Sequence, residues 1–317
     1  MQGINIPVLL VLAIRRIGVE TVGTYSFGTS PEVGESLIQI RASGKISLQG
    51  LTSIPEVSYW DMTKKIPTIS NFPKIHCPFV RRKFSVDQED WRRLGRQLQL
   101  RSPEAYLVVD VVNPGYEWVF DSPETFAVEK LDGSNVKVLA ENGRIVAAKN
   151  RENDLDLLEI GSNKMFLAEG ILLSAARGRL QHDGIQSGEV VGPKLQGNPY
   201  HLLVHEWYPF DIAAKELRYN SFHKYDRTFD NWSSWFENHL FSLFYRKNRP
   251  RTTDAPESVM SEGVVFYNLA RKAEGKTYMA KLRRDMFDWY YEGVEIIEYN
   301  KNADPEEPGS QNIVGGG

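Results

Sequence analysis

The sequence has almost no cysteine. Cys77 is the one cysteine among 317 residues, and one thiol forms no internal disulfide and builds no thiolate metal site. The six histidines include no pair at a ligand spacing such as His-x-x-x-His, so a zinc site is not expected either. A single cysteine is typical of proteins of reducing compartments, and we expect an intracellular protein of the cytoplasm or nucleus.

Long apolar runs are also missing. The most apolar stretch, residues 6–14, is followed directly by Arg15 and Arg16, and it is too short to span a bilayer. No basic stretch precedes it, so a secretory signal is not indicated either. We expect these residues to form a buried strand or the start of a core helix, and we expect no membrane partner.

An excess of positive charge is the third absence. The chain carries 38 Lys and Arg against 41 Asp and Glu, for a formal net charge of -3, so no global field attracts nucleic acid. A polyanion would need a local patch. Basic residues at 81–83, 92–96 and 246–251 are candidates for contacts with RNA phosphates, and Trp232, Trp235 and residues 289–291 for base stacking. Solvated surface charge remains the alternative for each run.

The chain falls into three parts. Residues 1–70 contain short apolar runs between Gly-, Ser- and Pro-bearing turns, which predicts a small β-rich accessory region. Residues 71–303 carry the strongest patterns and form the predicted catalytic domain. Residues 304–317 are rich in Pro, Glu and Gly, which predicts a flexible tail.

Helices and strands alternate irregularly in the central part. Ser85 with Gln88 has the pattern of a capping box, and Trp91, Leu94 and Leu98 recur at helical spacing, predicting a helix over 86–100. Further helices are expected over 165–179 and 232–244. Strands are expected over 105–112, around 189 and 204, and over 263–267 and 277–282. Two further strands over 125–140, with a break at Asp132-Gly133, and a third over 144–149 are expected to form an antiparallel meander. The order lacks βαβ regularity, so we predict an α+β fold with antiparallel sheets flanked by helices.

Residues 129–135, Glu-Lys-Leu-Asp-Gly-Ser-Asn, end one of these strands. A lysine at a strand end, before a turn that Gly133 permits, projects out of a sheet into a cleft. Lys130 is therefore a candidate nucleophile if its amine is deprotonated. A surface lysine beside a β-turn has the same three-residue pattern, Lys-x-Asp-Gly, so the motif alone is weak.

Further motifs follow in order. They are Lys149-Asn150-Arg151, Gly-Glu-Val-Val-Gly-Pro-Lys-Leu-Gln at 188–196, Tyr-Pro-Phe-Asp-Ile at 208–212, Glu-Gly-Val-Val at 262–265 and Ala-Lys-Leu-Arg at 280–283. In this order the sequence resembles the covalent nucleotidyltransferases of the polynucleotide ligase and capping-enzyme kind. Within them it is similar to the ATP-dependent RNA ligases typified by bacteriophage RNA ligase 2 and the kinetoplastid editing ligases.

The resemblance implies a nucleotidyltransferase fold, an ATP-grasp-like ligase fold, and a lysyl-AMP intermediate at Lys130. It implies ATP and Mg²⁺ or Mn²⁺ as cofactors, and as partner an RNA with 5′-phosphate and 3′-hydroxyl ends, bound by a monomer. Lys281 and Arg283 would join Lys130 in catalysis, with Arg283 where the family usually has a second lysine. The implied nucleotide-binding residues are Glu129, Leu131, Asp132, Gly133, Asn135, Arg151, Glu189, Phe210, Glu262 and Lys281, with Glu262 and Asn135 also implied at the metal through water.

Several of these residues have ordinary structural alternatives. Glu189 would hold the ribose in the family, but a strand carboxylate facing solvent has the same pattern. Phe210 would stack on adenine, although phenylalanine more often lies in a core. Glu262 would contact metal or phosphate through water, or cap a turn.

Other enzyme classes remain open. DNA ligases and capping enzymes continue past their last lysine motif with an oligonucleotide-binding barrel, and few residues follow Arg283, which favours an RNA ligase acting in RNA repair. The alternatives are a DNA ligase, a capping-type nucleotidyltransferase, or a non-ligating protein that binds RNA ends on the same scaffold.

Overall fold

The computed structural model describes residues 24–25, 38–40, 46–48, 68–95, 103–157, 164–224, 226–249, 255–268, 270 and 278–298. The chain divides into two compact units, Met1–Thr68 and Ile69–Gly317. In the first, β1 (Thr24–Tyr25), β2 (Ile38–Ile40) and β3 (Ile46–Leu48) form a three-stranded antiparallel sheet. The apolar stretch 6–14, residues 96–100 of the expected helix and the tail 304–317 lie outside the described residues, and the boundary at residue 70 stays a prediction.

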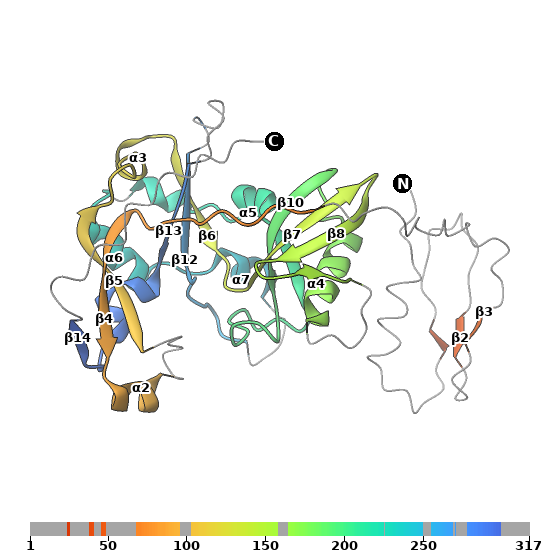
Figure 1. Ribbon diagram of the computed structural model, residues 1–317, viewed down its shortest axis with the longest axis horizontal. Coiled ribbons are helices and arrows are strands. Elements are labelled where there is room, and N and C mark those ends of the chain that lie inside the picture. The colour runs from red at the N-terminus through yellow and green to blue at the C-terminus, as the bar shows by residue number, and fades with distance from the viewer. Residues whose placement is uncertain are drawn as a thin grey trace. The chain divides into compact units, whose positions relative to one another are not determined.

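A five-stranded antiparallel sheet forms one half of the second unit (Figure 1). Its order is β11 (Glu206–Pro209), β10 (Gly184–Val191), β7 (Ser134–Glu141), β8 (Arg144–Asn150) and β9 (Asp154–Leu155). Val136 and Val138 of β7 are fully buried and pack with Leu167 and Ile171 of helix α4 (Met165–Ala176). Alternate residues point to opposite faces of a strand, so Asn135 and Lys137 share the face away from α4.

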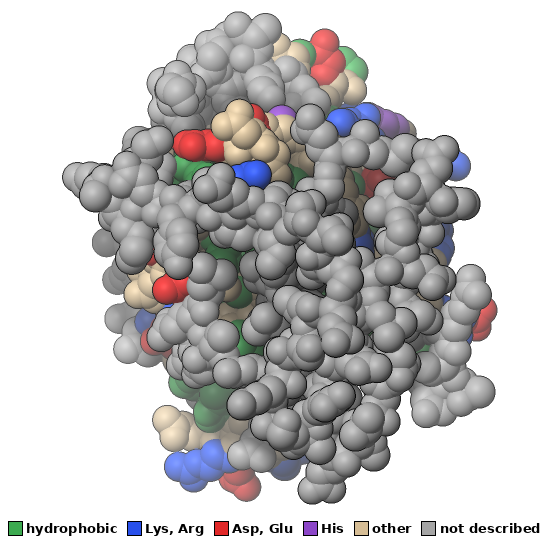
Figure 2. Space-filling model, turned by 90° about the vertical axis from the view of Figure 1, so that its right-hand side faces the viewer, with side chains coloured by type: hydrophobic (Ala, Val, Ile, Leu, Met, Phe, Trp, Pro, Cys, Tyr) green, Lys and Arg blue, Asp and Glu red, His purple; other side chains and the backbone are tan. Residues whose placement is uncertain are grey.

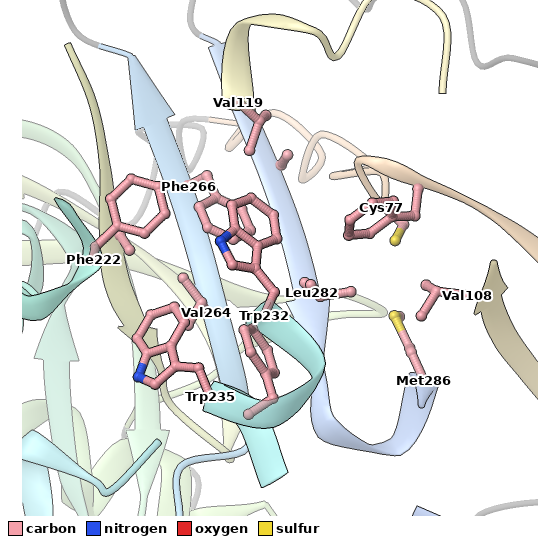
Figure 3. Packing of buried hydrophobic residues seen from close by; sticks show 14 of the residues in the cluster. Cys77, Val108, Val119, Phe222, Trp232, Trp235, Val264, Phe266, Leu282 and Met286 are labelled. Carbon is pink, nitrogen blue, oxygen red and sulfur yellow. The ribbon is translucent and has the colours of Figure 1, made fainter. Parts of the chain in front are cut away.

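A second sheet has the order β13 (Tyr278–Arg283), β12 (Gly263–Asn268) and β6 (Thr125–Lys130), again antiparallel. Helices α3 (Trp118–Asp121), α6 (Phe229–Asn238) and the 3₁₀ turn η1 (Asn220–Lys224) supply aromatic side chains to the core beside it. Trp232 stacks on Phe266 with ring centroids 4.9 Å apart, next to Phe222 and Trp235 (Figure 3). Trp232 and Trp235 are buried, so the prediction that they stack RNA bases is wrong.

The third sheet has the order β14 (Ile296–Glu298), β4 (Phe79–Val86) and β5 (Glu104–Val112). Helix α2 (Gln88–Leu94) follows β4, and the 3₁₀ turns η3 (Arg284–Met286) and η4 (Asp288–Tyr291) follow β13. The predicted helix start at Val86 is wrong, because Ser85 and Val86 lie in β4. The N-cap is Asp87, whose carboxylate accepts the Glu89 and Asp90 N–H groups.

The predicted α+β class is confirmed, and so are most of the strands. Three expectations need correction. β6 and β7 are not neighbours, because the break at Asp132-Gly133 carries the chain from one sheet to the other. The strand expected near Val204 begins at Glu206. The helix expected over 232–244 ends at Asn238, and a separate helix, α7 (Leu243–Asn248), begins after Ser242 caps it.

An extended segment, residues 69–76, runs past both sheets before β4 begins (orange in Figure 1); we call it the strap. The buried Lys137 ammonium on β7 donates to the Ser70 and Asn71 carbonyl oxygens at 3.0 and 2.9 Å. At its other end the His76 carbonyl accepts the main-chain N–H of Lys281 on β13, at 2.9 Å. The strap is thus hydrogen-bonded to a strand of each sheet.

Charged side chains of both signs are interspersed on the described part of the face in Figure 2. The described residues of the three basic runs lie on different elements, β4, α2 and the end of α7. Lys83 and Lys247 are each paired with a glutamate, Glu104 and Glu216, at 2.7 Å. No helix among the described residues is long and apolar enough to cross a membrane.

Candidate active site

Three residues form a row across the end of the second sheet. Lys130 is the last residue of β6 and lies opposite Gly263 of β12, which lies opposite Arg283 of β13. Paired residues point to the same face, and Lys281, two residues before Arg283, shares that face. A Cβ on Gly263 would come within 2.2 Å of the Leu282 carbonyl oxygen, so glycine keeps the strands close between the two cations.

Glu262 joins two of these cations. Its carboxylate lies 2.5 Å from the Lys130 ammonium and 3.9 Å from the Arg283 guanidinium. Glu262 directly precedes β12, which brings it beside the strand ends that carry Lys130 and Arg283. Both the lysine and the glutamate side chains are mostly buried, at 23% and 11% exposure, so solvent screens this pair little.

The lowered pKa of Lys281 shows that several positive charges lie close to it. The pKa of its ammonium is lowered to about 8, first by burial and then by the charges of Lys130, Arg283, Arg151 and Arg81, in that order. Arg151, exposed and just after β8, is therefore near the site even though it belongs to the other sheet. The predicted basic group is thus brought together from two sheets.

The five-stranded sheet contributes the polar groups facing this row. Asn135 of β7 and Glu189 of β10 are directly opposite each other. Burial raises the pKa of Glu189 to about 8, an effect that the Lys130 charge opposes and the Glu262 charge reinforces. The buried Oδ1 atom of Asn135 has no hydrogen-bond partner among the described residues, and unpaired buried polar atoms are costly and uncommon. It is therefore available to a ligand.

Gly133 closes the turn between the sheets for a reason other than the one expected. Its φ is not among the positive values of the chain, so the turn does not require left-handed backbone. A Cβ would instead lie 2.2 Å from the Val190 carbonyl oxygen and 3.0 Å from Glu189 Cγ. Glycine is needed because the turn packs directly on β10 beside Glu189.

Two predicted nucleotide-binding residues point their side chains into the protein. The buried carboxylate of Glu129 accepts hydrogen bonds from the Ser242 hydroxyl at 2.5 Å and the Phe244 N–H at 2.7 Å. Leu131 is buried in an apolar cluster with Tyr200 and Phe244. Any nucleotide contact of Glu129 or Leu131 would therefore come from the main chain.

Asp132 and Phe210, also among the predicted residues, are only partly buried. Asp132 is half-buried, and its main-chain N–H donates to the Tyr200 hydroxyl at 2.8 Å. Phe210 directly follows strand β11 and begins helix α5 (Phe210–Glu216). It is half-buried and belongs to none of the four apolar clusters of described residues, so its ring is not a core side chain.

The comparison with family models decides the assignment. The model for RNA ligases matches residues 123–283, slightly more than half of the chain, and this segment runs from just before β6 to the end of β13. The chain belongs to the RNA ligase family. The matched segment includes the site residues predicted from the sequence, from Glu129 to Arg283.

Solved structures of RNA ligases from Naegleria gruberi are among the matches. The enzyme with PPi is 19% identical over 50% of this chain and 49% of its own, with a TM-score of 0.30. A variant with ATP and Mn is 16% identical over 81% of this chain and 76% of its own, with a TM-score of 0.32. The chain spans about half the length of the first two solved relatives, 49% and 51%. No curated protein sequence matches it.

Some residues around this RNA ligase family site were not found from the sequence. Tyr200 and Lys137 have no pattern of their own, because each acts through a partner more than 60 positions away in the chain. Gly263 was noted only as part of the motif at 262–265, and its role depends on a neighbouring strand. Arg81 was noted only as part of a basic run. Among the described residues no group of three or more His, Cys, Asp or Glu could hold a metal.

Proposed function

We propose that this protein is an ATP-dependent RNA ligase that forms a covalent lysyl-AMP at Lys130. It then transfers the AMP to a 5′-phosphate RNA end and seals that end to a 3′-hydroxyl, in RNA repair. The observation that carries the proposal is that Lys130, Lys281 and Arg283 share one face of a sheet. The Glu262 carboxylate lies between Lys130 and Arg283. A nucleophile surrounded by cations suits attack on a phosphate.

In the first step the Lys130 amine attacks the α-phosphorus of ATP. A nitrogen–phosphorus bond forms, the bond to the β-phosphate oxygen breaks, and pyrophosphate leaves. The ammonium must first give up a proton, and the Glu262 carboxylate, 2.5 Å away, is placed to accept it. Lysine suits the role of nucleophile because the covalent adenylate that it forms divides one difficult condensation into two easier steps.

The cations of β13 have a separate role. Negative charge on the phosphate oxygens grows as the bond to pyrophosphate breaks. Lys281 and Arg283 share the face of Lys130, so they would neutralise that charge. Because burial and nearby cations bring the pKa of Lys281 to about 8, an anionic phosphate would favour its charged form.

The five-stranded sheet would hold the nucleoside. Glu189 stands across from Asn135 beside the Lys130 turn, within reach of a ribose attached to a phosphate at Lys130. Its buried carboxyl is a hydrogen-bonding group that ribose hydroxyls would satisfy. Phe210, whose ring is outside the described core clusters, would stack on the adenine.

A divalent metal fits the donors present. Mg²⁺ and Mn²⁺ favour oxygen ligands and are held by few protein groups together with water and substrate phosphates. Asn135 offers a buried, unpartnered amide oxygen, and Glu262 would contribute through water. When bound, the metal would stabilise charge on the phosphates.

The later steps use the same pocket. The 5′-phosphate of RNA attacks the phosphorus of the lysyl-AMP, which releases Lys130 and leaves a 5′–5′ linkage to AMP. The 3′-hydroxyl of the other end then attacks the activated 5′-phosphate, a phosphodiester forms, and AMP leaves. No further cofactor is required, because ATP supplied the activated phosphate.

The first prediction concerns the adduct. Incubation with ATP and Mg²⁺ or Mn²⁺ gives an AMP adduct by intact mass, and Lys130→Ala abolishes it because the nucleophile is lost. Lys215→Ala, which changes an exposed lysine of α5, keeps the adduct and serves as the matched control. Absence of an adduct with every metal and with ATP, GTP and NAD would contradict the proposal.

Sealing assays then identify the reaction class. A ligase joins 5′-phosphorylated to 3′-hydroxyl RNA ends, and the rate on DNA ends of the same sequence tests the DNA ligase alternative. An adduct without sealing of either nicked or single-stranded RNA would indicate a capping-type enzyme or a protein that only binds ends.

A further inference from the structure

A loop of residues 192–202, between β10 and β11, packs beside the turn that follows Lys130; we call it the Tyr200 loop. Its backbone is costly to form, because Gln196, Asn198 and His201 have left-handed φ values of 48°, 55° and 51°. Such conformations persist where surrounding contacts determine them, and they concentrate at functional sites. The loop is therefore held in one shape by specific contacts.

Those contacts act at both ends of the loop. The side chain of Asn198 donates to the Leu202 carbonyl at 3.0 Å and accepts the Leu202 N–H at 2.9 Å. The main-chain N–H of Lys194 donates to the ring Nε2 of buried His205 at 3.2 Å. Between these anchors the chain has little freedom to move Tyr200.

Tyr200 connects this rigid loop to the turn. Its side chain is 1% exposed, and its ring meets that of Phe244 edge to face with centroids 4.9 Å apart. Its hydroxyl oxygen accepts the main-chain N–H of Asp132 at 2.8 Å, two residues after Lys130. The other side of the turn rests on β10, where Gly133 packs against Val190.

We propose that Tyr200 is a positioning residue, whose hydroxyl fixes the Leu131–Asp132 backbone and thereby the direction in which Lys130 leaves β6. The role rests on the proposed function, since it serves the attack of Lys130 on a phosphate. A lysine side chain has several rotatable bonds, so its aim depends on where the main chain places its Cα. Small losses of alignment at a reacting atom reduce rates strongly.

The test compares two buried tyrosines of one apolar cluster. Tyr200→Phe removes the acceptor for Asp132. Tyr245→Phe removes a hydroxyl that donates to the Pro256 carbonyl at 2.6 Å, also buried and in the same cluster. The measurements are thermal unfolding and, from pre-mixed ATP and Mn²⁺, the rate of adduct formation and its apparent KM for ATP.

Both variants are expected to lose a similar few degrees of thermal stability. Tyr200→Phe alone is expected to slow adduct formation at saturating ATP by about tenfold or more, with the KM changed less than about twofold, because alignment and not binding is lost. If Tyr200 has only a structural role, the two variants should form the adduct at equal rates. Equal rates would therefore overturn the proposal.

A second variant covers the case in which Tyr200→Phe does not fold. Asn198→Gly retains the left-handed backbone but removes both hydrogen bonds to Leu202, so it loosens the loop while keeping the tyrosine. It is expected to show the same loss of rate at unchanged KM, and a wild-type rate overturns the proposal. If the wild-type protein forms no adduct, the proposed function itself is contradicted. If the wild-type protein forms the adduct and Tyr200→Phe forms it at the same rate, only the positioning role is overturned.

Discussion

At the scale of single residues, burial of the Glu189 carboxyl makes the free energy of unfolding depend on pH. Glu189 is buried, and burial raises its pKa to about 8 from the ordinary 4.5. Between these values the folded state holds a proton that the unfolded chain has released. The free energy of unfolding therefore falls as pH rises through this window.

We expect Glu189→Gln to remove that dependence. Glutamine keeps the shape without the charge, so unfolding in urea at pH 8 should cost on the order of 2 kcal/mol more than for the wild type, with little difference at pH 5. Adduct formation should fall at the same time, because the proposed ribose contact changes. An equal effect at both pH values would mean that ionisation of Glu189 is not the cause.

At the scale of elements, a buried carboxylate connects β6 to α7. Glu129 accepts the Phe244 N–H in the first turn of α7 and the hydroxyl of Ser242, the N-cap. Burial raises the pKa of Glu129 to about 7 despite these hydrogen bonds. Glu129 and Lys130 thus point to opposite faces of one strand, the first fixing a helix and the second facing the proposed substrate.

Glu129→Ala should therefore destabilise the fold by about 2 kcal/mol, because two buried donors lose their acceptor. The measurement is urea unfolding at pH 7. Lys247→Ala is the control: it removes an ion pair between α7 and Glu216, at 2.7 Å, whose side chains are both 46% exposed, so the loss should be below about 1 kcal/mol. Equal losses in the two variants would show that Glu129 does not secure α7.

Much of the element order was predictable because local patterns determine it. The run of β-branched residues in β5 and the alternation of apolar and polar residues in β7 both predict strands. Partnership between strands has no local signal, so the separation of β6 from β7 into two sheets was missed. Asp87 replaced Ser85 as the cap because pairing with β5 and β14 extends β4 to Val86, a tertiary effect that overrides local preference.

The candidate site was predictable only in part, for the same reason. Ordered motifs indicated Lys130, Glu189, Glu262 and Lys281, and their assignment to a nucleotide stays a prediction. The direction of the Glu129 side chain follows from strand alternation, but which face meets α7 depends on a helix more than 100 residues away. The support given by Tyr200 likewise depends on a contact across the fold.

For the whole molecule, charge is near balance and its placement matters more than its sum. A net charge of -3 gives no long-range attraction for RNA, whereas four other cations act on Lys281. Affinity for RNA should therefore depend on a small number of phosphate contacts.

We expect the logarithm of RNA affinity to fall with the logarithm of salt concentration at a shallow slope. Arg283→Ala should reduce that slope by about one unit, because one phosphate contact is lost. The slope is measured by fluorescence anisotropy of a labelled 5′-phosphorylated RNA at increasing KCl concentration. Arg144→Ala, at the opposite end of β8 from Arg151, should leave the slope unchanged, and an equal change there would argue for diffuse binding.

The strap also limits how the site can open. It is hydrogen-bonded to β7 through Lys137 and to β13 through His76, and an extended chain has little length to spare. The two sheets therefore cannot draw apart like jaws while both attachments hold. We therefore expect the proposed nucleotide site to open by rotation about the turn after Lys130, with the strap keeping its length, or by release of one attachment. The strap in that sense favours an angular change between the two sheets over a translational one.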